Sequence, residues 1–144
     1  WTATSATASD FQAASSSAMA TAYATTDTLQ TVATDTLTDL TSITASITPS
    51  STSSKILVVG RIQGIPSYGF GFAIIRGASN IFETADDYDV YPVGRYTVSP
   101  IMYIDSPSTT SSTTYKIQVK TYNDNTCDFQ SGGTSNIGLI EILG

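Results

Sequence analysis

The chain of 144 residues contains no histidine and one cysteine, Cys127. Without histidine, a Ser-His-Asp triad, a Cys-His pair and an imidazole metal site are all excluded. One cysteine cannot form a disulfide within the chain, and we expect Cys127 to be a small, semi-buried side chain beside Phe129, the alternatives being a bond between chains or a free thiol. The sequence also lacks a P-loop and a dinucleotide-binding fingerprint in the required context. We therefore expect that the protein is not an enzyme and needs no cofactor.

Charged residues are scarce as well. They make up 12% of the sequence, which is roughly half of the usual share. The six Lys and Arg residues are scattered, and the formal net charge is −6, so we expect no nucleic-acid partner, because such a surface needs clustered cations. No apolar run approaches the roughly 18 residues of a membrane span, and we expect no membrane insertion. The abundant Ser and Thr residues are typical of extracellular or particle-bound β-proteins.

Alternation of apolar and hydroxyl side chains marks a first clear strand. Ile43, Ala45 and Ile47 alternate with Thr and Ser, which is the period of two of a half-buried strand. Pro49 cannot donate to a ladder and ends this strand, and the Ser/Thr run that follows turns the chain. Lys55 then opens a run of branched apolar residues that favours a second strand.

Further strand patterns follow at a spacing of about 8–12 residues. We expect strands near 18–24, 28–33, 55–63, 69–76, 94–104, 113–122 and 136–143. We expect breaks at 64–66, 77–80, 105–107 and 131–133, where turn residues cluster. Many short strands without a convincing helix predict an all-β, antiparallel β-sandwich. An alternative for residues 10–45 is a helical stalk, because some aliphatic residues there have helical spacing, but the density of Thr makes it less favoured.

The first residues differ from the rest in composition. Residues 1–17 are mainly Ala, Ser and Thr, with almost nothing to bury. Ser and Thr compete for backbone hydrogen bonds and so lower the helix propensity of this stretch. We therefore expect an extended arm or linker over 1–17 and a β-sandwich head over 18–144.

Two of the expected strands are apolar on both sides. One contains Ile56 to Val59 and the other runs from Ile137 to Leu143. Strands of this kind need cover on both faces, which a thin sandwich cannot supply. A second covered face in so small a chain usually means another subunit, so we expect self-association.

Three blocks of the sequence resemble phage virion fibre proteins, especially those of viruses that infect cyanobacteria and other marine bacteria. The blocks are I-T-P-S-S and S-K-I-L-V within 47–58, Y-I-D-S-P and T-T-Y-K-I-Q-V within 103–119, and S-N-I-G-L-I-E-I at 135–142. They stand in the order found in those proteins and frame about residues 40–144. The resemblance implies a compact jelly roll, similar to the heads of tumour necrosis factor and C1q, that associates as a homotrimer.

The resemblance also implies a function. We expect a non-enzymatic structural protein at the virion surface, the trimeric fibre or spike head of a bacteriophage, with other virion proteins and a host-surface glycan as its partners. One alternative is a capsid decoration or vertex-fibre protein that reinforces the particle. A further alternative, from another class, is a secreted bacterial adhesin or carbohydrate-binding module.

The candidate contact residues lie between Ile65 and Pro92. A dense acidic cluster there can coordinate Ca²⁺ if backbone carbonyls complete the ligand set, although its spacing is not that of an EF-hand. A solvated acidic loop is the more favoured alternative, and a glycosidase carboxylate pair the least favoured. Three tyrosines in expected loops can stack on sugars, the alternative being that Tyr is simply a good strand residue. The candidate metal ligands are Glu83, Asp86, Asp87 and Asp89, and the candidate receptor-contact residues are Tyr68, Tyr88 and Tyr91.

Overall fold

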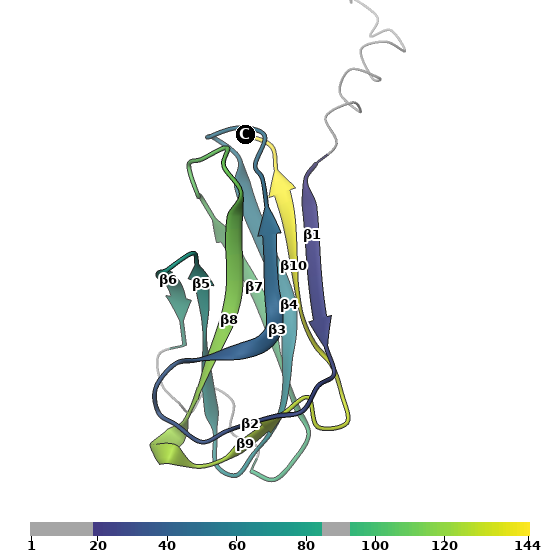
Figure 1. Ribbon diagram of the computed structural model, residues 1–144, viewed down its shortest axis with the longest axis vertical. Coiled ribbons are helices and arrows are strands. Elements are labelled where there is room, and N and C mark those ends of the chain that lie inside the picture. Colours follow the sequence, from purple (N-terminus) through teal and green to yellow (C-terminus); the bar gives the residue numbers. More distant parts are fainter. Residues whose placement is uncertain (1–18, 85–92) are drawn as a thin grey trace, which may run out of the picture.

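The computed structural model describes residues 19–84 and 93–144, which form two antiparallel β-sheets packed face to face (Figure 1). The strands are β1 (Thr21–Thr26), β2 (Gln30–Val32), β3 (Thr38–Ile47), β4 (Lys55–Pro66), β5 (Phe70–Arg76), β6 (Ser79–Glu83), β7 (Thr97–Asp105), β8 (Thr113–Thr121), β9 (Cys127–Phe129) and β10 (Ser135–Ile142), with a 3-10 turn, η1 (Tyr122–Asp124), after β8. One sheet has the order β1-β10-β4-β9-β2, with β7 also paired to β4, and the other has the order β3-β8-β5-β6. The expected all-β antiparallel sandwich is confirmed.

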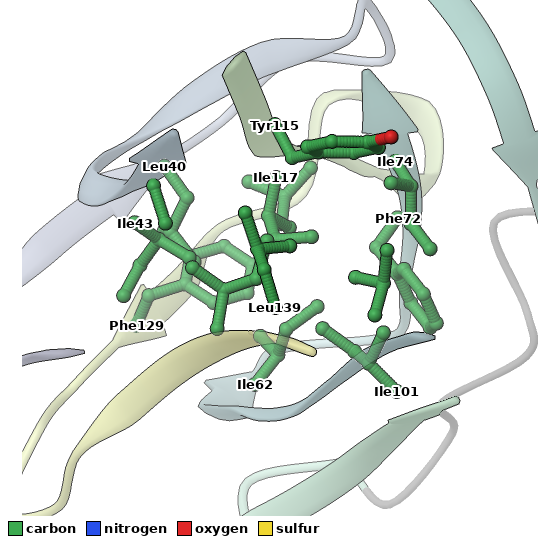
Figure 2. Close-up of a cluster of buried hydrophobic side chains, with 14 of the residues drawn as sticks. Leu40, Ile43, Ile62, Phe72, Ile74, Ile101, Tyr115, Ile117, Phe129 and Leu139 are labelled. Atoms are coloured by element: carbon green, nitrogen blue, oxygen red, sulfur yellow. The ribbon is translucent and has the colours of Figure 1, made fainter. Parts of the chain in front are cut away.

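The core between the sheets is built from the alternating apolar residues. Ile56, Val58 and Ile62 point inward from β4 and are fully buried, as are Ile137 and Leu139 of β10. Figure 2 shows side chains from both sheets converging on one cluster, among them Leu40, Ile43, Ile74, Ile117, Phe129 and Leu139. Burying each such side chain contributes roughly 1.5–3 kcal/mol, so this cluster is the main source of stability.

One expected break is wrong, and the reason is packing. Residues 64–66 do not turn the chain but extend β4, where Gly64 pairs with Phe129 and Pro66 with Cys127. A Cβ at Gly64 would lie 2.9 Å from Cys127 Sγ and 3.3 Å from Phe129 Cδ1. The absence of a side chain at Gly64 therefore lets Cys127 and Phe129 pack against β4, and Gly64 does not bend the strand.

Other boundaries differ from the expectation by small amounts. β7 begins at Thr97 instead of 94, because Gly94 has a φ of 64° in the turn before it. The strands β6 and β9 were not predicted, and each exists through its pairing with neighbours. The helical alternative for 10–45 is wrong from residue 19 onward, where β1, β2 and most of β3 lie. The arm expected over 1–17 falls outside the described residues.

Cys127 is more deeply buried than a semi-buried residue. Its side chain is fully buried on β9, in the same core cluster as Phe129. Burial, with a smaller effect of the nearby Asp128 charge, raises the pKa of the Cys127 thiol to about 12. The thiol is therefore protonated and unreactive at neutral pH, and the residue acts as a small apolar filler.

The two ends of the sandwich differ. At one end, which we call the terminal end, β1 begins, β10 finishes and the loop after β3 turns (Figure 1). At the opposite end lie β2, β9 and η1, together with the turn between β4 and β5 that contains Tyr68 (Figure 1).

Candidate functional site

The outer face of the six-stranded sheet carries a band of apolar side chains across β1, β10, β4 and β7. Because paired residues in neighbouring strands point to the same side, the strand register groups them in rows. One row joins Tyr23, Gly138, Val59 and Met102, and the next joins Thr21, Ile140, Leu57 and Ile104. We call the apolar members of these rows, with Ile142 at the end of β10, the apolar face.

Much of the apolar face is open to solvent in the single chain. Met102 is 83% exposed, Tyr23 65% and Ile104 55%. Leu57, Val59 and Ile140 are half-buried, so the outward sides of the two doubly apolar strands are only partly covered within the chain. A contiguous exposed apolar patch with this composition marks an interaction surface.

Along β4, the apolar face ends at polar residues. On β4, Lys55 and Arg61 are the outward residues beyond Leu57 and Val59, and both are exposed. The centre is shallow because Gly138 has no side chain, and a Cβ there would lie 3.3 Å from Val59 Cγ2. An apolar centre that ends at charged side chains is an arrangement found at protein interfaces.

Tyr68 has an aromatic partner that the sequence did not indicate. Its ring stacks on that of Tyr122 in η1, with centroids 4.9 Å apart and an angle of 24° between the planes. Ser67 holds the turn in place, because its N–H donates to the carbonyl of Thr126 at 2.8 Å and the two hydroxyls lie 2.7 Å apart. The structure thus presents Tyr68 and Tyr122 as a half-exposed pair at the opposite end of the sandwich.

Glu83, at the end of β6, forms an ion pair and accepts a side-chain hydrogen bond. Its Oε1 lies 3.0 Å from Lys120 Nζ, and its Oε2 accepts a hydrogen bond from Asn80 Nδ2 at 2.6 Å. The Lys120 hydrogen bond lowers the pKa of Glu83, so this carboxylate is already compensated. The other members of the two candidate groups, Asp86, Asp87, Tyr88, Asp89 and Tyr91, lie outside the described residues, so both groups stay predictions. Within residues 19–84 and 93–144, no three His, Cys, Asp or Glu residues gather as metal ligands do.

Glu141 is a buried charge in a strand that reads as apolar. Its side chain is fully buried near the terminal end and accepts hydrogen bonds from Ser50 N at 2.6 Å, Ser50 Oγ at 2.7 Å and Ala20 N at 3.2 Å. The Ser50 hydroxyl, followed by the Ser50 N–H, is the main cause that lowers the pKa of Glu141 to about 2. This carboxylate joins β10 to the loop after β3 and to the residue before β1, so its role is structural.

Comparison with known proteins supports the fold and goes no further. No protein-family model matches the sequence, and no curated protein matches it. Among solved structures, the chain is similar to the tumour necrosis factor Eiger of S. frugiperda, with a TM-score of 0.51, 13% identity, and coverage of 86% of this chain and 92% of that one.

Two further solved structures show weaker similarity. An insecticidal delta-endotoxin of Bacillus thuringiensis, Cry8Ea1, gives a TM-score of 0.42 and 13% identity over 82% of this chain, which spans 19% of that one. A chain of infectious bursal disease virus, Gt strain, gives a TM-score of 0.42 and 10% identity over 81% of this chain, which spans 33% of that one.

The chain therefore has a jelly roll of the tumour-necrosis-factor type, as the sequence resemblance implied. Within the part of the chain that the structure describes, no helix is long and apolar enough to cross a membrane.

Proposed function

We propose that this chain is a non-enzymatic structural protein of a bacteriophage particle, the head of a trimeric fibre or spike that is displayed at the virion surface and contacts the host. The observation that carries the proposal is the apolar face. Side chains such as Met102, at 83% exposure, are costly to leave in water and gain stability when a partner covers them.

A second copy of the same chain is the partner that fits this face best. Each copy carries a net charge of −6, which opposes close contact unless the interface avoids acidic groups. The centre of the apolar face is uncharged, and its nearest charged borders on β4 are the cations Lys55 and Arg61. The face can therefore accept an acidic copy without repulsion, and the sequence resemblance implies three copies around a threefold axis.

The arrangement of the two ends is suited to display. If the particle holds the head from the terminal end, the opposite end is displayed, where the turn after β4 and η1 carry the Tyr68–Tyr122 pair (Figure 1). Tyrosine rings bind the apolar faces of sugars at little entropic cost. We infer that this end makes the host contact, together with Tyr88 and Tyr91, and that any Ca²⁺ would be held by the acidic cluster between Glu83 and Asp89.

The oligomeric state tests the proposal directly. In native mass measurement at micromolar concentration, the protein should have three times the 15.1 kDa mass of the chain. Met102→Glu should weaken the trimer strongly, because it places a charge in the apolar face, whereas Leu29→Glu should not, since Leu29 is 57% exposed elsewhere. A stable monomer of the unaltered protein would contradict the proposal.

The place of the protein in a particle separates the remaining alternatives. Locating it by cryo-electron microscopy on a tail or neck would support the fibre head, and a regular position on the capsid would favour a decoration protein. Genes for tail, portal or capsid proteins beside its own gene would contradict a bacterial adhesin. A fall in the viscosity of host polysaccharide on incubation with the protein would contradict the non-enzymatic assignment.

A further inference from the structure

A second candidate ligand site lies at the start of β8, whereas Tyr68 and its partner Tyr122 lie near the end of that strand. A hollow of about 330 Å³ opens there between the end of β5, the start of β8 and the loop that joins β7 to β8. It is lined by Arg76, Gly77, Pro107 and four hydroxyl side chains from the stretch 109–114. This volume is at the lower end of the range of small-molecule sites.

Arg76 is held in a fixed position at this hollow. Its Nη1 lies 2.9 Å from both carboxylate oxygens of Asp105, the last residue of β7. Asp105 also accepts a hydrogen bond of 2.7 Å from the hydroxyl of Tyr115, and Tyr115 is fully buried. Burial and the Asp105 contact raise the pKa of Tyr115, so its hydroxyl stays a proton donor. The guanidinium group is thus positioned by buried residues before any ligand arrives.

The described residues use only part of the hydrogen-bonding capacity of Arg76. A guanidinium has five N–H donors, and only those on Nη1 have acceptors among residues 19–84 and 93–144. The side chain is 31% exposed and lines the hollow. The edge formed by Nε and Nη2 has the fork geometry that binds a carboxylate through two parallel hydrogen bonds.

The rest of the hollow suits a sugar ring. Hydroxyl side chains such as those of Thr109 and Ser112 can donate to and accept from sugar hydroxyls. Pro107 and Gly77 add apolar surface against which the C–H face of a ring can lie. Because Asp105 already compensates the charge of Arg76 and the chain is acidic overall, a ligand with one negative charge fits better than a dianion such as a phosphomonoester.

We propose that this hollow binds a sugar that carries a single carboxylate, of the uronic acid class, with Arg76 paired to the carboxylate. The hollow lies at the terminal end, because Thr113 pairs with Ile47 at the end of β3, so the inference does not rest on the host contact proposed for the opposite end. Binding itself is a property of the isolated protein, so it fails or succeeds independently of the oligomeric state.

Titration of the purified protein followed by two-dimensional NMR tests the site. Sodium glucuronate should shift the amide signals of Gly77, Thr113 and Thr114 in a saturable way. Glucose, which has the same ring without the carboxylate, should bind at least tenfold more weakly. Equal binding of glucose, tighter binding of inorganic phosphate, or shifts confined to other parts of the chain would overturn the proposal.

Two pairs of variants locate the binding. Arg76→Lys keeps the charge and loses the fork, so it should weaken glucuronate binding at least tenfold, while Arg61→Lys, the same change at an exposed arginine on β4, should leave it unchanged. Ser112→Trp should fill the hollow and abolish binding, whereas Ser111→Trp, one residue away and outside the lining, should not. The Ser112 pair leaves the Arg76–Asp105 contact intact, so it decides the matter even if Arg76→Lys fails to fold. Unchanged binding in the Ser112 variant would refute the site.

Discussion

The two sheets of this sandwich have very different outer faces. On the four-stranded sheet, outward side chains satisfy each other: Lys116 Nζ lies 2.7 Å from Asp39 Oδ1, Gln118 donates to the same carboxylate, and Ser46 and Thr114 share a hydrogen bond. On the six-stranded sheet, the corresponding positions form the apolar face. Both faces follow the same alternation along their strands, so the fold does not require the difference. The outward side chains of the four-stranded sheet find their hydrogen-bond and ion-pair partners within one chain. The side chains of the apolar face leave water only when a partner covers them.

The largest effect is expected from a charge placed inside the apolar face. Ile140 lies between Leu57 and Thr21 in the second row and is half-buried in the single chain. Ile140→Asp would bury an unpaired carboxylate in the assembled protein, at a cost of several kcal/mol, and should abolish the trimer. The measurement is sedimentation at micromolar concentration.

The matched control introduces the same residue on the polar face. Thr44 is exposed and pairs with Lys116 on the four-stranded sheet. Thr44→Asp places a carboxylate beside a cation and should leave the oligomer intact. If both variants assemble equally well, the contrast between the two faces has no bearing on assembly.

A smaller effect is expected from the carboxylate that closes the terminal end. Glu141→Gln keeps the shape of the side chain, but its amide oxygen can accept only from the Ser50 donors, and its NH2 group would then face the Ala20 N–H. The change should cost about 1–3 kcal/mol in the free energy of unfolding. The same change at Glu83, whose side chain is 34% exposed on the polar face, should cost less. Urea denaturation of the two variants at neutral pH gives this comparison.

The pH dependence provides an independent test of Glu141. Its pKa falls from the ordinary 4.5 to about 2 on folding. The group therefore stabilises the fold fully above pH 4.5, and this contribution is lost progressively as the pH falls toward 2. Glu141→Gln should remove that part of the acid sensitivity, and an unchanged acid profile in the variant would show that the carboxylate is not held as the structure indicates.

The sequence predicts the parts of the fold in which a single strand carries its own signal. The alternation in β3 and β8 and the apolar run of β10 were all found near their expected places. β6 and β9 could not be predicted, because they are defined by the partners they pair with. The break at 64–66 was predicted wrongly for a related reason. From sequence alone, a glycine that leaves room for the Phe129 ring cannot be distinguished from a glycine in a turn.

The candidate surfaces, like β6 and β9, depend on contacts between segments that are distant in the sequence. The two doubly apolar strands suggested that one face needs cover, but Tyr23 and Met102 join that face only through the register of β1 and β7. Tyr68 lies in an expected loop, whereas its partner Tyr122 is the last residue of the strand expected over 113–122. Stacking between residues 54 positions apart follows from how the loops meet, which the sequence does not indicate. The Arg76 hollow depends on three separate strand ends and has no sequence signature.

The smallest effect is expected on the polar face itself. Asp39 is 57% exposed, and the hydrogen bond from Lys116, followed by that from Gln118, lowers its pKa below the ordinary 3.8. Because exposed ion pairs contribute little, Asp39→Asn should reduce the free energy of unfolding by less than about 1 kcal/mol.

Salt and pH should identify the cause of that small loss. The contribution of Asp39 should be present above pH 3.8, disappear below it, and shrink at high salt, which screens exposed charges. Asp27→Asn, at an exposed aspartate for which no ion pair is found among the described residues, should show no comparable loss at low salt. The trimer should be unaffected in both variants, since neither residue lies on the apolar face. A loss of assembly in Asp39→Asn would mean that the four-stranded sheet also contacts a partner. The inference that only the apolar face takes part in assembly would then be wrong.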